Sequence, residues 1–137
     1  MDQIAEIKRL SREYEFLGLK RSGLLAFAAL MSDNEVPELV LMERDVWISG
    51  KRLSGMRPGV CLTDRQVIVV NYASRFRPSK YEVIDRASIV SVSEYAKRTF
   101  EMQLSDGRCI KIRGLIGGKR QDDMTRNLYD RIRSKLN

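Results

Sequence analysis

The stretch that decides the fold runs from Gly59 to Ile84 and reads GVCLTDRQVIVVNYASRFRPSKYEVI. Its first apolar run, Val60–Leu62, is followed by the polar turn Thr63–Gln66 and by a second apolar run, Val67–Val70. β-Branched side chains packed on both sides of a short polar turn predict two antiparallel strands, because branching at Cβ stiffens a side chain against a helical turn. After a basic loop, residues 81–84 predict a third strand.

Further short strands are expected on both sides of this stretch. Residues 45–48 predict a strand in which Trp47 is a large core residue or a lid. Alternating apolar and polar residues predict strands over 88–95, 99–104 and 109–113, the last two joined by an Asp-Gly turn. Residues 36–42 are apolar without clean alternation, so the pattern assigns them no element.

Helices are expected at both ends of the chain. Apolar residues at three- and four-residue steps predict a helix over 2–17 and a second over 19–31. A last helix over 121–136 carries an apolar residue at every fourth position from Met124 to Leu136. Seven short strands followed by one helix predict an α+β fold, an antiparallel barrel or orthogonal sandwich that the C-terminal helix caps.

The composition indicates one domain with an appendage. At 137 residues, 43% of them hydrophobic, the chain can bury a core, and we divide it into a helical segment, 1–35, and a β-rich domain, 36–137.

The longest nearly uncharged segment, 22–32, is about half of the ~20 residues that cross a bilayer. The first residues do not resemble a signal peptide, so we expect a cytoplasmic protein, with peripheral membrane association as an alternative.

Charge is distributed unevenly along the chain. Residues 1–45 hold six Lys/Arg and nine Asp/Glu, a net charge of −3, whereas the remaining residues hold nineteen and nine, a net charge of +10. A basic body favours anionic partners such as lipid headgroups, nucleic acid or an acidic protein surface. The uneven charge also fits a role in solubility, or a packing arrangement in which the acidic residues 1–45 lie against the basic remainder of the chain.

The sequence lacks the residues and motifs that are typical of enzyme active sites. Without histidine the commonest general base is absent, and Cys61 and Cys109 lack the spacing of a metal site. Residues 114–120 lack the spacing of a phosphate-binding loop. We therefore expect no catalytic residue, no metal and no cofactor, and two free thiols.

The order of elements resembles the pleckstrin-homology-like (PH-like) superfold. The motif at Gly59–Val70 looks like that of the bacterial PH and YokE-like families, with the eukaryotic GRAM domain as a relative: a Gly, an apolar strand, Thr-Asp, a basic residue and another apolar strand. Gln66 departs from it, since these families often have a second basic residue there. The resemblance covers about residues 43–136 and implies a non-catalytic scaffold that binds lipid headgroups, peptides or proteins.

Basic residues are expected to gather at one end of such a meander, an expectation from alternation of the loops that we call loop parity. Alternate loops emerge on the same side, so 49–59, 73–80 and 96–98 would form a basic rim. Its candidate anion-binding residues are Lys51, Arg52, Arg57, Arg75, Phe76, Arg77, Lys80, Lys97 and Arg98. A focused rim attracts anions more strongly than scattered charge, although a purely solubilising rim is the alternative.

Our first functional expectation is an adaptor that acts through protein contacts, assisted by the basic rim. The helical hairpin either covers one face of the sheet or offers Leu24, Phe27 and Met31 as an interface for a partner or a second copy. Binding to anionic lipid headgroups is the second expectation, and nucleic-acid binding is the third.

Overall fold

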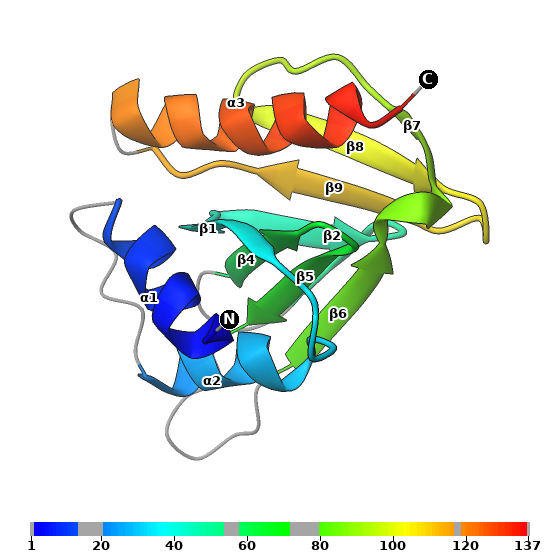
Figure 1. The fold of residues 1–137 in the computed structure, drawn as a ribbon. Helices are drawn as coiled ribbons and strands as arrows, with labels where there is room; N and C mark the ends of the chain where they lie inside the picture. Colours follow the sequence, from blue (N-terminus) through cyan, green and yellow to red (C-terminus); the bar gives the residue numbers. More distant parts are fainter. Residues whose placement is uncertain (1, 14–20, 54–57, 72–79, 117–118, 137) are drawn as a thin grey trace.

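The computed structural model describes residues 2–13, 21–53, 58–71, 80–116 and 119–136 (Figure 1). The helices are α1 (Gln3–Arg12), α2 (Arg21–Ala29) and α3 (Lys119–Ser134), with a short 3-10 turn, η1 (Arg86–Ser88). The strands are β1 (Pro37–Met42), β2 (Asp45–Ile48), β3 (Lys51–Arg52), β4 (Pro58–Thr63), β5 (Gln66–Asn71), β6 (Lys80–Asp85), β7 (Ile89–Val92), β8 (Thr99–Leu104) and β9 (Cys109–Arg113).

The strands form two antiparallel sheets. The first sheet has the order β1-β4-β5-β6 and the second the order β3-β2-β9-β8-β7. The consecutive strands β1 and β2 therefore belong to different sheets, because β1 pairs with β4 and β2 pairs with the distant β9. Within the described residues no strand pairing joins the two sheets, so a closed barrel is not what the structure shows.

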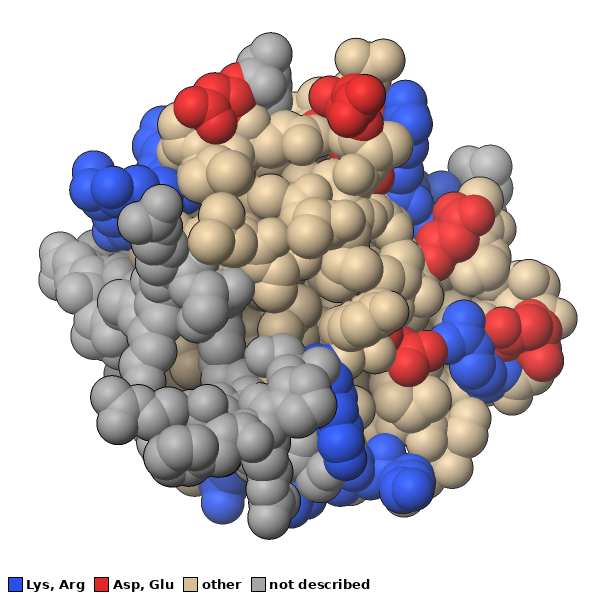
Figure 2. All heavy atoms as spheres, turned by 90° about the horizontal axis from the view of Figure 1, so that it is seen from below, with Lys and Arg blue, Asp and Glu red and all other residues tan. Residues whose placement is uncertain are grey.

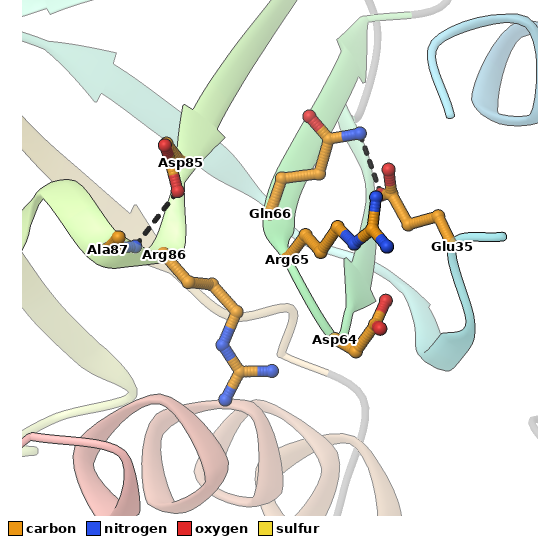
Figure 3. Close-up of a pocket in the computed structure, with 7 residues that line it drawn as sticks. All are labelled: Glu35, Asp64, Arg65, Gln66, Asp85, Arg86 and Ala87. Atoms are coloured by element: carbon orange, nitrogen blue, oxygen red, sulfur yellow. Dashed lines mark hydrogen bonds between the residues drawn. The ribbon is translucent and has the colours of Figure 1, made fainter. Parts of the chain in front are cut away.

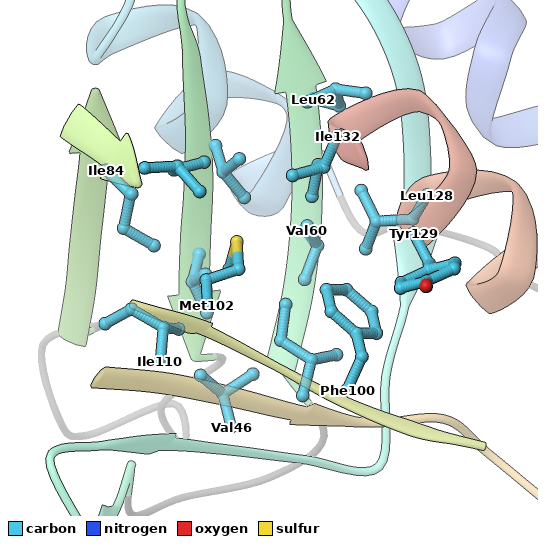
Figure 4. Close-up of a cluster of buried hydrophobic side chains, with 14 of the residues drawn as sticks. Val46, Val60, Leu62, Ile84, Phe100, Met102, Ile110, Leu128, Tyr129 and Ile132 are labelled. Carbon is cyan, nitrogen blue, oxygen red and sulfur yellow. The ribbon is translucent and has the colours of Figure 1, made fainter. Parts of the chain in front are cut away.

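The core between the two sheets is closed by α3. Alternate residues of the first sheet, such as Val60 and Leu62, meet Phe100 and Met102 of the second sheet. Leu128 and Ile132 of α3 pack against the same cluster (Figure 4). The four-residue apolar spacing in the sequence thus identified the buried side of this helix.

A second core lies on the opposite face of the first sheet, under α1 and α2. Val40, Cys61 and Ile68 point to this side, where they meet Ile7 and Phe27 from the helices. The first sheet is therefore covered on both faces, which explains the nearly continuous apolar runs of β4 and β5.

This second core corrects one expectation. Leu24 is 7% exposed and Phe27 is 0% exposed, and Met31 is partly buried against the same cluster. Leu24 and Phe27 cannot offer a surface to a partner while α2 stays on the sheet. The hairpin instead covers one face of the sheet, the alternative reading of the same apolar stripe.

The other expected elements compare closely with the structure. Strands at 45–48, 99–104 and 109–113 have the expected bounds. The expected strand at 88–95 is shorter in the structure, because Ser88 belongs to η1 and residues 93–95 lie outside any strand. The described residues contain nine strands rather than about seven. The two additions are β1, to which the sequence assigned no element, and the two-residue β3. Cys61 is buried, Cys109 is half-buried, and both thiols are free.

Candidate functional site

A tight hairpin places the first basic residues of the candidate site. Ser49 and Gly50 have φ values of 49° and 85°, so the chain reverses in the left-handed region that a two-residue hairpin turn requires. Lys51 and Arg52 are thereby returned beside Ile48 and Trp47 as the edge strand β3. The hairpin thus carries two cations along the edge of the second sheet.

A cavity of about 270 Å³ brings these cations together with Lys80. Its lining residues are Ile48, Lys51, Arg52, Leu53 and Lys80. Asn71 connects the two sides, because its side-chain amide donates to the Leu53 carbonyl at 2.9 Å while its backbone pairs with Lys80. We call this cavity the basic pocket. Three of the expected anion-binding residues, from segments nearly thirty residues apart, share it.

The remaining rim residues divide into two groups. Arg57, Arg75, Phe76 and Arg77 lie outside the described residues. Lys97 and Arg98 do not line the basic pocket. Their turn adjoins the Thr99–Arg113 pair, whereas the Ser49–Gly50 turn adjoins Cys109 at the other end of β9. Loop parity failed here because it assumed an uninterrupted meander, and β2 pairs with β9 instead.

The outer face of the second sheet carries a cluster of arginines around a nearly buried carboxylate. Arg113 donates to Asp45 Oδ2 from Nε at 3.1 Å and from Nη2 at 2.5 Å. Arg44 and Arg52 approach the same carboxylate at 3.8 Å and 3.7 Å. Sequence reasoning missed this cluster, since its members meet only through the pairing of β2 with β9.

Trp47 stands beside this cluster rather than in the core. The Lys111 Nζ atom lies 5.0 Å from the centroid of its ring, and the Arg113 guanidinium carbon lies 5.1 Å from it. The indole is half-buried on the outer face, because its neighbours Val46 and Ile48 take the inward positions. Of the two expectations for Trp47, the core position is therefore wrong.

A second, polar cavity of about 470 Å³ lies where the β4–β5 turn meets the corner between β6 and η1 (Figure 3). Its buried wall is Glu35, which accepts hydrogen bonds from Thr63 Oγ1 at 2.6 Å and Gln66 Nε2 at 2.7 Å. Thr63 also accepts from the backbone of Arg65 and Gln66, so it caps the turn. The Thr-Asp-Arg-Gln motif thus has a structural explanation, and the Gln66 side chain donates to the carbonyl of Leu30, the residue that follows α2.

A buried carboxyl group connects α3 to the junction of β1 and β2. Glu43 is 0% exposed, and Thr125 Oγ1 donates to its carboxylate at 3.0 Å. Burial raises the pKa of Glu43 to about 8, and the hydroxyl of Thr125 lowers that pKa only in part. The carboxyl group is therefore mostly protonated at neutral pH. It stands outside both cavities.

Among the described residues, the face on which α2 lies is uncharged at its centre, with Lys, Arg, Asp and Glu side chains around it (Figure 2). The sequence accounts for this, because no charged residue occurs between Ser22 and Ser32. Leu25 is exposed there while Phe27 is buried. Among the described residues, none from α1 or α2 lines the basic pocket.

The described residues offer neither a metal site nor a membrane-spanning helix. No group of three or more Cys, Asp or Glu side chains is arranged to hold a metal ion in the described part of the chain. Among the described helices, none combines the length and the apolar character that crossing a membrane requires.

Comparisons with known proteins yield a likeness of fold. No protein-family model and no curated protein matches the chain. Among solved structures, it is similar to an N-terminally truncated linker-DH/PH domain structure of p115-RhoGEF, with a TM-score of 0.51 and 14% identity. The match covers 98% of this chain and 41% of that one. Two antiparallel sheets, a C-terminal helix and this likeness together support a PH-like fold.

Proposed function

We propose that this protein is a non-catalytic PH-like binding module that associates with anionic membrane surfaces through the basic pocket. The observation that carries the proposal is the common cavity of Lys51, Arg52 and Lys80. Arg57, Arg75, Phe76 and Arg77 join the proposal on sequence grounds, as the basic loops that flank these residues. Assignment to the bacterial PH, YokE-like or GRAM-like groups rests on the Gly59–Val70 motif and is part of the same proposal.

The chemistry of the pocket suits a phosphorylated or carboxylated headgroup. Arginine presents a planar fork that matches phosphate and carboxylate oxygens, and lysine adds a compact charge. Ile48 and Leu53 line the same cavity, so an anion there would be partly shielded from water. Lower local dielectric strengthens each charge–charge contact.

This proposal reverses the order of our first two expectations. The protein-contact function relied in part on Leu24, Phe27 and Met31, and the first two are buried between α2 and the first sheet. The lipid alternative relied on the basic residues, and three of them meet in one cavity. Anion binding at the pocket is therefore the function that the geometry favours.

The direct test is sedimentation with vesicles. We expect the protein to co-sediment with vesicles of phosphatidylcholine containing phosphatidylserine, and to remain in the supernatant with phosphatidylcholine alone. Binding should weaken as the salt concentration rises from roughly 0.05 to 0.5 M, since screening shortens the reach of surface charges. The double variant Lys51→Glu/Lys80→Glu should lose most of the binding.

A charge-matched control separates the pocket from net charge. Lys8→Glu/Lys135→Glu changes the net charge equally at two exposed positions outside the pocket. It should bind nearly as the parent protein does. Equal losses in the two double variants, with both folded by circular dichroism, would show that general charge and not the pocket causes association.

A further inference from the structure

The outer face of the second sheet has the composition of a protein-binding surface. Its residues, which we call the tryptophan face, are Arg44, Asp45, Trp47, Arg52, Lys111 and Arg113. They come from β2, β3, β9 and the residue before β2. Tryptophan and arginine are the side chains most enriched among residues that dominate binding energy at protein interfaces.

Internal contacts orient this face before any partner arrives. Arg113 is fixed by two hydrogen bonds to Asp45 and lies 5.1 Å from the Trp47 ring centroid. The Asp45 side chain is only 11% exposed, so the carboxylate acts as a buried anchor for the arginines around it. A preorganised face loses less side-chain entropy when it binds.

Arg44 and Arg52 retain their donor capacity. Each lies near Asp45, at 3.8 Å and 3.7 Å, which is ion-pair range but longer than a hydrogen bond. Within the described part of the chain neither guanidinium donates a hydrogen bond, and their side chains are 47% and 53% exposed. Both planar forks are therefore available to external oxygen atoms.

We propose that the tryptophan face binds an acidic polypeptide segment of a partner protein. Arg44, Arg52, Arg113 and Lys111 outnumber the carboxylate of Asp45 and that of the neighbouring Glu101, so the face is net positive and complementary to Glu and Asp side chains. Arginine forks bind carboxylates with two parallel hydrogen bonds, and Trp47 supplies apolar contact area between them.

The same face is less suited to nucleic acid. Glu101 on β8 stands opposite Lys111 in the register, and Asp45 lies among the arginines. A polyphosphate backbone with fixed charge spacing would meet both carboxylates. A polypeptide can place its acidic side chains over the arginines and neutral ones elsewhere.

This inference goes beyond membrane association and fails or succeeds separately from it. The basic pocket uses Lys51 and Lys80, whereas the tryptophan face uses Arg44 and Lys111, and Arg52 belongs to both. Variants that avoid Arg52 therefore address one site at a time. A protein with both sites would bring an acidic partner to a membrane surface.

The chain contains a single tryptophan, so Trp47 fluorescence reports on this face directly. The probe is a synthetic peptide, acetyl-GEEGEEGEEG-amide, titrated into the 137-residue protein, with acetyl-GQQGQQGQQG-amide as the neutral control. We expect a saturable change in Trp47 emission with the Glu peptide only. Arg44→Glu/Lys111→Glu should weaken the apparent affinity at least tenfold while the thermal unfolding transition is retained.

Two control variants separate the tryptophan face from the basic pocket and from net charge, and an oligothymidine strand tests nucleic acid as the ligand. Lys51→Glu/Lys80→Glu and Lys8→Glu/Lys135→Glu should each change the affinity for the Glu peptide less than threefold. The proposal is overturned by an absence of saturable emission change, by equal losses in the control variants, or by tighter binding of an oligothymidine strand than of the Glu peptide. None of these results bears on vesicle binding through the basic pocket.

Discussion

The two sheets of this protein differ in how many of their faces are buried. The first sheet is covered on one side by the second sheet and α3 and on the other by α1 and α2. The second sheet buries only its inner face, and its outer face carries Trp47, Arg52 and Lys111. Within the first sheet, only the edge strand β6 keeps exposed side chains, and its first residue, Lys80, lines the basic pocket. Both of our proposals therefore use the outer face and edge of the second sheet, with Lys80 as the one contribution of the first sheet.

The largest expected effect of a substitution falls on the helix side of the first sheet. Phe27→Ala should lower the free energy of unfolding by about 3–5 kcal/mol, because a 0% exposed aromatic side chain would leave a cavity against Ile68 and Val70. Chemical denaturation followed by circular dichroism measures the loss. Leu25→Ala, on the same helix but 43% exposed, is the control and should cost less than about 1 kcal/mol. Similar losses in the two variants would mean that α2 is not packed as described.

The next effect concerns pH and the attachment of α3. The Glu43 carboxyl has a pKa of about 8 in the folded chain against an ordinary value of 4.5, so its protonated form stabilises the fold. That stability is fully present below pH 4.5 and is lost as pH rises toward 8. Between pH 5 and pH 8 the free energy of unfolding should fall by on the order of 3 kcal/mol from this group.

Glu43→Gln provides the control for this pH dependence. The amide keeps the size of the side chain and does not titrate, so the variant should lose most of the decline in stability above pH 5. Its neighbours are the Thr125 hydroxyl and, through charge, the phenol of Tyr95, whose own pKa burial raises far above this range. Parallel stability–pH curves for the parent protein and the variant would contradict a buried, protonated carboxyl group.

A smaller effect is expected where β9 runs into α3. A Cβ atom at Gly114 would lie 2.6 Å from Thr125 Oγ1, so Gly114→Ala must shift the Thr125 side chain or α3, the helix that carries it. Overpacking of this kind costs about 1–3 kcal/mol. Thermal unfolding should show the loss, with Ile116→Ala, at a 67% exposed position, as the control. An unchanged midpoint for Gly114→Ala would mean that α3 sits farther from β9.

The smallest effect is expected on the outer face of the second sheet. Lys111→Gln removes an exposed contact with the Trp47 ring, and such cation–π contacts are worth about 0.5–1 kcal/mol. The variant should therefore unfold nearly as the parent protein does while its affinity for the acidic peptide falls. A destabilisation as large as that of Phe27→Ala would show that this face has a structural rather than a recognition role.

The sequence predicted best those elements whose pattern is local. The strands at 99–104 and 109–113 alternate clearly because only one of their faces is buried, and α3 shows its apolar side at every fourth residue. β1 was not predicted, because a strand that is buried on both faces loses the alternation of apolar and polar residues that indicates a strand. β3 was missed for a different reason, because Lys51 and Arg52 are two exposed residues without an apolar pattern.

The candidate site was predicted only in part. Loop parity brought Lys51, Arg52 and Lys80 together correctly, but it misplaced Lys97 and Arg98 because it could not foresee that β2 pairs with β9. The arrangement of Asp45, Trp47 and Arg113 depends on that same long-range pairing, across 68 positions for Asp45 and Arg113. No local pattern reports such a contact.

Hydrogen–deuterium exchange, measured with and without anionic vesicles, tests most directly the claim that the basic pocket binds anionic membrane surfaces. We predict slower exchange on vesicle addition in 46–53 and in the first residues of β6, with α1 and α2 unchanged. Protection confined to α1 and α2, with 46–53 unaffected, would contradict the account.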